Sequence, residues 1–87
     1  MTKMYVRHTA ADFSKWKTVF DGHEATRRKF GAKKAEVFTG FKNPYEILIS
    51  IEWDNKDQAK NFLEKSDIKD VLKEGGVLGA PEINFAE

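Results

Sequence analysis

The sequence contains no cysteine, which excludes disulfide bonds, thiolate catalysis and thiolate metal sites. It has no run of about 18 apolar residues, and the N-terminal MTKMYVRHT lacks the continuous apolar stretch of a signal peptide. An excess of one charge is also missing, because 15 Lys and Arg stand against 14 Asp and Glu with the signs interspersed. We therefore expect a cytoplasmic protein that binds neither a membrane nor nucleic acid.

The 87 residues are enough for one domain spanning 1–87, with a modest core. Aromatic residues supply much of the apolar volume, since the chain has seven Phe, two Trp and two Tyr. A chain of this size buries only about 60% of the surface of its unfolded state. A partner chain would add to its stability.

The first half of the chain predicts a strand followed by a helix. Residues 3–9 alternate and are rich in ring and branched side chains, as in a strand. Thr9 and Asp12 form a capping-box pattern, so we expect a helix from about residue 10 to Phe30. Gly31 should end it, because glycine accepts a left-handed conformation. The apolar residues with helical spacing are Phe13, Trp16, Val19 and Phe20.

Two strands should follow as a hairpin, over 33–41 and 45–53, joined by the turn KNP. The second strand alternates cleanly, with Ile47, Ile49 and Ile51 on one face. Glu46, Ser50 and Glu52 lie on the other face, where they form either an interface network or, less simply, paired catalytic carboxylates. We predict a core on the isoleucine face.

The last third of the chain predicts a broken helix and a final strand. Asp54, with Asp57 three positions on, should cap a helix that breaks at 65–67 and ends at the glycine pair 75–76. The segment GGVLGAP lacks both common phosphate-loop patterns, so we interpret it as the end of the helix plus a connection to the last strand. Residues 81–87 form the fourth strand.

The order is β-α-β-β-α-β, which predicts an α+β protein with the ferredoxin-like βαββαβ fold. Its two helices should cover one face of a four-stranded antiparallel sheet. The open face would carry Phe38, Leu48 and either Tyr5 or Arg7. We expect two chains to pack sheet to sheet there, as a homodimeric α/β barrel.

His23 and Arg27 are unusual because both fall on the inward arc of the first helix, one turn apart, where their side chains should meet. They form either a general base and an anion clamp in a pocket, or a packed ring beside an arginine held by Glu46 or Glu52. Gly22 falls outside this arc, which indicates a local bend or a close neighbour.

His8 shares a strand face with Met4 and Val6, close to the start of the helix. It either lines the mouth of a pocket or packs in the core or at an interface. The spacing along the helix and strand places His8 and His23 at opposite ends, so we expect no metal site between them. The aromatic residues either anchor the core or hold a ligand, and those we select as ligand-binding are Trp16, Phe20, Trp53 and Phe62.

Three long blocks of the sequence together carry a resemblance: YVRHTAADFSKWKTVFDGHEATRRKFG, NPYEILISIEWDN and GVLGAPEINF. They resemble the antibiotic biosynthesis monooxygenase-like proteins, and in particular a branch labelled cyclase-like, over nearly the whole chain. The resemblance implies a homodimeric ferredoxin-like barrel and a pocket where small aromatic or polyketide-like compounds are oxidised without a metal or flavin. Haem-degrading relatives carry a histidine on the second helix, and residues 54–74 contain none.

The leading hypothesis is thus an enzyme that resembles cofactor-independent monooxygenases or cyclases, with His23, Arg27 and His8 as catalytic candidates. In it, His23 or His8 moves a proton and Arg27 stabilises negative charge on an aromatic substrate. One alternative is a non-catalytic small-ligand-binding or stress-associated dimer that uses the same pocket. A third is a structural dimer without a pocket.

Overall fold

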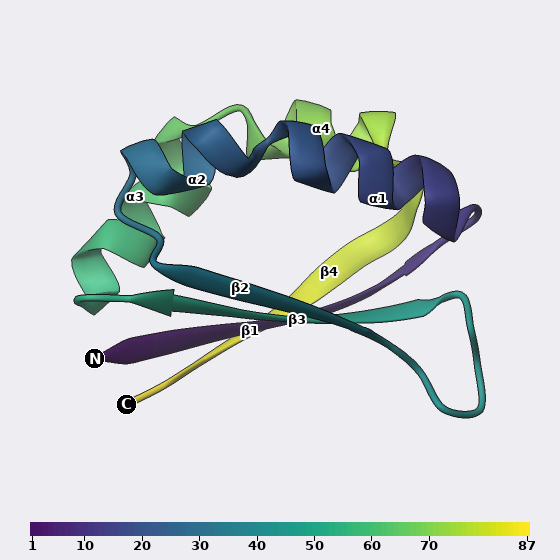
Figure 1. The fold of residues 1–87 in the computed structure, drawn as a ribbon, viewed down its shortest axis with the longest axis horizontal. Helices are drawn as coiled ribbons and strands as arrows, with labels where there is room; N and C mark the ends of the chain where they lie inside the picture. The colour runs from purple at the N-terminus through teal and green to yellow at the C-terminus, as the bar shows by residue number, and fades with distance from the viewer.

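The computed structural model describes residues 1–87 and shows a four-stranded sheet with all the helices on one face (Figure 1). The elements, in chain order, are β1 (Thr2–Ala10), α1 (Phe13–Gly22), α2 (Glu24–Lys29), β2 (Lys34–Thr39), β3 (Glu46–Trp53), α3 (Lys56–Lys65), α4 (Ile68–Glu74) and β4 (Val77–Ala86). Every neighbouring pair of strands is antiparallel, in the order β2-β3-β1-β4. The predicted α+β ferredoxin-like fold is confirmed.

The central strand β1 positions the residues that face the helices. Alternate side chains along it are buried, from Thr2 through Met4, Val6 and His8 to Ala10. In the register, Val6 lies opposite Ile49 of β3 and Ile83 of β4. The predicted isoleucine face of β3 is confirmed, because Ile47, Ile49, Ile51 and Trp53 are all buried.

The predicted first helix is wrong as a single element, because it breaks at His23 into α1 and α2. A side chain at Gly22 would meet nothing within 4 Å, so this glycine accompanies a bend and not a close neighbour. The helix also begins later than expected. Since β1 continues to Ala10, the cap is Asp12, whose side chain accepts a hydrogen bond from the backbone of Lys15.

The second helical region breaks at 65–67, as predicted, into α3 and α4. Its cap is Asn55 and not Asp54, because the Asn55 side chain accepts from the backbone N–H of Gln58 at 3.0 Å. Gln58 also lies 2.7 Å from where a side chain at Gly31 would begin. Gly31 has a φ of 108°, so the predicted end of the first helical region at this residue is confirmed. Glycine is favoured there both by the positive φ and by the close approach of Gln58.

The helix α4 ends at its C-cap Gly75, as predicted, but β4 begins at Val77, four residues earlier than expected, so the predicted connection over 77–81 is wrong. The register of β4 against β1 shifts between Arg7, which lies opposite Glu82, and Thr9, which lies opposite Leu78. Three residues of β4 therefore bulge at the position of His8. Gly79 has a φ of 74°, which a bulge of this kind favours.

The core lies between the sheet and the helices, where Trp53 and Phe62 are the largest fully buried side chains. On the opposite, uncovered face, Tyr5 is 44% exposed and Phe38 is 53% exposed. Arg7 and Glu46 form an ion pair of 3.1 Å on that face, so at least one of its carboxylates is paired within the chain. The sheet thus has a packed face and a mixed, open face.

Candidate functional site

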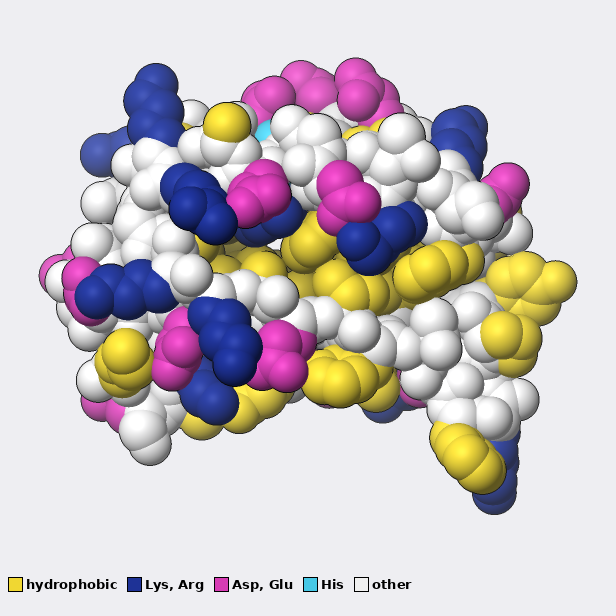
Figure 2. All heavy atoms as spheres, viewed as in Figure 1, with side chains coloured by type: hydrophobic (Ala, Val, Ile, Leu, Met, Phe, Trp, Pro, Cys, Tyr) yellow, Lys and Arg dark blue, Asp and Glu magenta, His cyan; other side chains and the backbone are white.

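A cavity of about 280 Å³ lies between the sheet and the helical layer. Figure 2 shows a neighbouring hollow between the helices and β2, with hydrophobic side chains at its bottom and charged side chains at its rim. Most of the lining of the cavity is apolar and comes from β1, β3, β4 and all the helices. An apolar cavity of about 150 Å³ accommodates benzene. The volume therefore suits a compound of about two fused rings.

His8 reaches this cavity from the central strand, and only 6% of its surface is exposed. Neither of its ring nitrogens has a hydrogen-bond partner in the protein. Burial disfavours the charged imidazolium and so lowers the pKa of His8 below its ordinary value. His8 therefore presents a neutral ring whose unprotonated nitrogen can accept a proton or a hydrogen bond.

A row of side chains in ring contact follows one wall of the cavity. The ring of His8 lies 5.5 Å from Trp16, and Trp16 stacks on Phe20 at 4.9 Å. The guanidinium carbon of Arg27 lies 3.7 Å from the centre of the Phe20 ring, at a cation–π distance. An aromatic wall thus has an imidazole at one end and a cation at the other.

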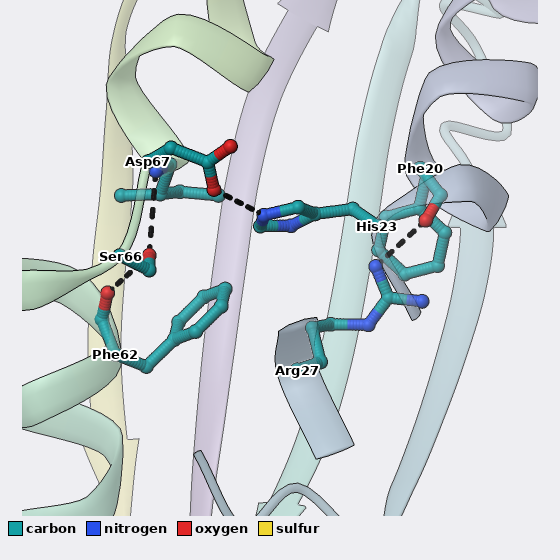
Figure 3. A network of polar contacts seen from close by, with 7 residues as sticks. Phe20, His23, Arg27, Phe62, Ser66 and Asp67 are labelled. Atoms are coloured by element: carbon teal, nitrogen blue, oxygen red, sulfur yellow. Dashed lines mark hydrogen bonds and ion pairs between the residues drawn. The ribbon is translucent and has the colours of Figure 1, made fainter. Parts of the chain in front are cut away.

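His23 lies at the break between α1 and α2 and points across to the start of α4 (Figure 3). Its Nε2 is 2.8 Å from Oδ1 of Asp67, and its ring packs against Phe62 at 5.7 Å. The contact with His23 holds the pKa of the Asp67 carboxyl below its usual value. The Asp67 carboxylate therefore fixes the orientation of the His23 ring.

Arg27 is 5% exposed and also lines the cavity, but it does not share a hydrogen bond with His23. Its Nη1 donates to the backbone carbonyl of Phe20 at 2.7 Å (Figure 3). Burial lowers the pKa of Arg27, although Glu24 and Asp21 oppose this change through their negative charge. Neither of the expected partners, Glu46 and Glu52, binds Arg27, whose hydrogen bond is to Phe20. Glu46 pairs with Arg7 instead.

Six of the seven selected site residues line one cavity, namely His8, His23, Arg27, Trp16, Phe20 and Phe62. Trp53 does not line the cavity: it is fully buried behind Phe62, with their rings 5.4 Å apart. His8 and His23 were expected at opposite ends of the first strand, and a single cavity reaches both rings because it extends along that strand. No group of three or more His, Cys, Asp or Glu side chains is placed to hold a metal ion.

Two polar residues of this site, Asp67 and Lys69, were not among the candidates selected from the sequence. Asp67 binds His23 across 44 residues of sequence, a pairing for which the sequence has no periodic signal. Lys69 lines the cavity from α4, a helix without a buried residue. The predicted break at 65–67 was the available sign, because residues at a helix break are free to turn toward a neighbouring element.

None of the helices is long and apolar enough to cross a membrane. Neither a family model nor a curated protein matches the sequence. Solved structures do match the fold, among them a candidate antibiotic biosynthesis monooxygenase from Bordetella bronchiseptica, with a TM-score of 0.86 and 9% identity. The match covers 99% of this chain and 94% of that one.

Two further structures agree with this match. SnoaB, a cofactor-independent oxygenase from Streptomyces nogalater, has a TM-score of 0.81 at 11% identity, over 99% of this chain and 90% of its own. A candidate antibiotic biosynthesis monooxygenase from Deinococcus radiodurans has a TM-score of 0.73 at 20% identity, over 100% of this chain and 91% of its own. The chain therefore has the fold of the antibiotic biosynthesis monooxygenases, as its sequence resemblance predicted.

Proposed function

We propose that the protein binds a small hydroxylated aromatic compound in the cavity and oxidises it with molecular oxygen, without a metal or flavin. The observation that carries the proposal is His8, a buried imidazole without a protein partner on the wall of an apolar cavity. Buried polar groups are nearly always hydrogen-bonded in folded proteins. A ligand hydroxyl would supply the partner that His8 lacks. The fold shared with the cofactor-independent oxygenase SnoaB supports the same chemistry.

His8 is the favoured base, and His23 is the second candidate. The neutral ring of His8 can accept the proton of a phenolic hydroxyl. The Nε2 of His23 is already bound to Asp67, so this ring has only its other nitrogen to offer a ligand. A carboxylate bound to one nitrogen orients an imidazole for base catalysis. His23 is therefore the second candidate for the base.

The reaction follows from removal of the hydroxyl proton. The phenolate is electron-rich and can give electrons directly to O₂, while the cation of Arg27, at the other end of the aromatic wall, favours a negatively charged ligand in the cavity. One oxygen atom then replaces the hydrogen of a ring carbon and forms a carbonyl there, and the original hydroxyl becomes a second carbonyl. The other oxygen atom leaves as water with the two hydrogens. The balance is thus a phenol plus O₂ giving a quinone plus water.

The protein is proposed to act as a homodimer in the cytoplasm, with two open sheet faces packed together. The middle of that face carries a shallow hollow of about 320 Å³, lined in part by Tyr5, Phe38 and Leu48. Phe38 is more than half exposed in the single chain. Covering such side chains would add hydrophobic stabilisation that an 87-residue chain needs.

The test is oxygen consumption with a series of phenols and quinols of one to three rings, including 1-naphthol. We expect uptake with two-ring compounds and formation of the quinone. His8→Gln should lower the rate by about 100-fold or more, because general-base catalysis contributes about 10²–10⁴-fold. Binding of the same compound should change by only a few fold, since glutamine keeps a hydrogen-bonding group at this position.

His23→Gln is the matched control, because it changes another histidine of the same cavity. If His23→Gln removes the activity and His8→Gln does not, the assignment of the base is wrong. Tight binding without any oxygen uptake would instead favour the non-catalytic binding module. The structural dimer without a pocket is disfavoured already, since the cavity exists.

A further inference from the structure

The ionisable side chains that line the cavity are His8, His23, Arg27 and Lys69, and no carboxylate is among them. Arg27 and Lys69 are cations, and the lowered pKa of His8 keeps its ring neutral near pH 7. An otherwise apolar cavity thus has positive charge on its wall without a matching negative charge. Such a charge is costly to bury unless an anion comes to meet it.

Of these two cations, Arg27 is the better candidate to bind an anion, because it is almost wholly buried and has no carboxylate partner of its own. Its one hydrogen bond is to a backbone carbonyl. The two acidic groups that influence it are already paired on the surface: Asp21 with Lys17 at 2.6 Å, and Glu24 with Arg28 at 2.9 Å. The planar fork of Arg27 therefore keeps donors that can bind both oxygens of a carboxylate.

The position of Arg27 lets a ligand reach it. It borders the apolar cavity and also a second, charged hollow of about 450 Å³ between the helices and β2. Within the apolar cavity, the stacked rings of Trp16 and Phe20 lead from His8 to Arg27. A flat molecule lying along these rings would present one end to an unpartnered imidazole and the other to an unpaired cation.

We propose that the ligand is an aromatic carboxylic acid with a hydroxyl group at its far end. Its carboxylate pairs with Arg27, its rings pack along Trp16 and Phe20, and its hydroxyl hydrogen-bonds to His8. The inference rests on the proposed function and assigns Arg27 to a carboxylate that the ligand itself carries. It narrows the ligand from any hydroxylated aromatic compound to a hydroxyaryl acid.

The experiment compares three compounds by titration calorimetry: 6-hydroxy-2-naphthoic acid, its methyl ester, and 2-naphthol. We expect the acid to bind about 10- to 100-fold more tightly than the ester, the range for hydrogen bonds between charged groups. Arg27→Gln should reduce that preference to less than about 2-fold. Lys29→Gln is the matched control, because it removes a neighbouring cation of α2 that is exposed and lines neither hollow, and it should preserve the preference.

Equal binding of the acid and the ester to the unchanged protein would overturn the inference and leave the proposed function standing. If none of the three compounds binds, the inference and the proposed function both fail. Persistence of the preference in Arg27→Gln would also contradict the inference. The comparison of acid with ester needs no variant, so it decides the matter even if Arg27→Gln fails to fold.

Discussion

A larger side chain on β3 should stabilise the protein where it fills the cavity. The same substitution should destabilise the protein where the side chain enters the packed core. Ile51 and Ile47 lie on the same face of β3, and both are buried. Ile51 lines the cavity and Ile47 does not. Replacing each in turn by phenylalanine adds the same atoms in two environments, so Ile47→Phe is the control for Ile51→Phe.

The magnitude follows from the number of atoms added. Phenylalanine has three more side-chain carbons than isoleucine, worth up to roughly 2 kcal/mol if they are buried without strain. At Ile51 the cavity of about 280 Å³ can take them, so after some strain we expect a gain of about 1 kcal/mol in unfolding free energy. At Ile47 the packed core has to move, which costs about 1–3 kcal/mol.

The assay is urea unfolding followed by tryptophan fluorescence, with unchanged m-values required for the comparison. A gain of about 1 kcal/mol corresponds to a rise of about 4–8 °C in Tm for a domain of this size. Equal destabilisation by the two variants would refute the reasoning, because it would mean that the cavity cannot accept the ring. Ile51→Phe should also weaken binding of two-ring phenols, since it occupies part of their space.

Two further predictions concern pH and assembly. Burial places the pKa of His8 below its value of 6.5 in the unfolded chain, so the unfolded state binds the proton first as the pH falls. The free energy of unfolding should therefore decrease below about pH 6.5, by at most about 1.4 kcal/mol per pH unit for this proton. In His8→Leu, the urea midpoint should decrease less over the same pH range. An unchanged slope in His8→Leu would show that another group titrates. For assembly, size-exclusion chromatography should give about twice the chain mass of 10.0 kDa, and Phe38→Glu on the open face should give a monomer; a monomeric unchanged protein would contradict the dimer.

The order of elements and the buried faces could be predicted from the sequence because they depend on local periodicity. The alternation around Ile49 and the helical spacing of Trp16 and Phe20 are each visible within a few residues. The prediction that His23 and Arg27 face inward is also confirmed, since both are buried although the helix breaks at His23. Angular position along a helix survives a small bend.

The partners of the site residues could not be predicted in the same way. Asp67 reaches His23 only because α4 packs near the end of α1, and nothing in either local sequence specifies that approach. Arg27 binds the carbonyl of Phe20, which at the break also accepts from the backbone N–H of His23, instead of the carboxylates expected for it. Long-range pairing and backbone acceptors depend on tertiary packing, which the periodicity of one element does not describe.

The bulge opposite His8 affects how the cavity could diversify. On either side of it, β4 is fixed to β1 by regular pairing, at Leu78 and again from Glu82 onward. The residues between, which include Pro81 on the cavity wall, are outside that pairing. Substitutions or single-residue insertions in this short segment can therefore reshape the wall beside His8 while the sheet stays intact. This segment is where a designer should randomise the chain to change the shape of the cavity.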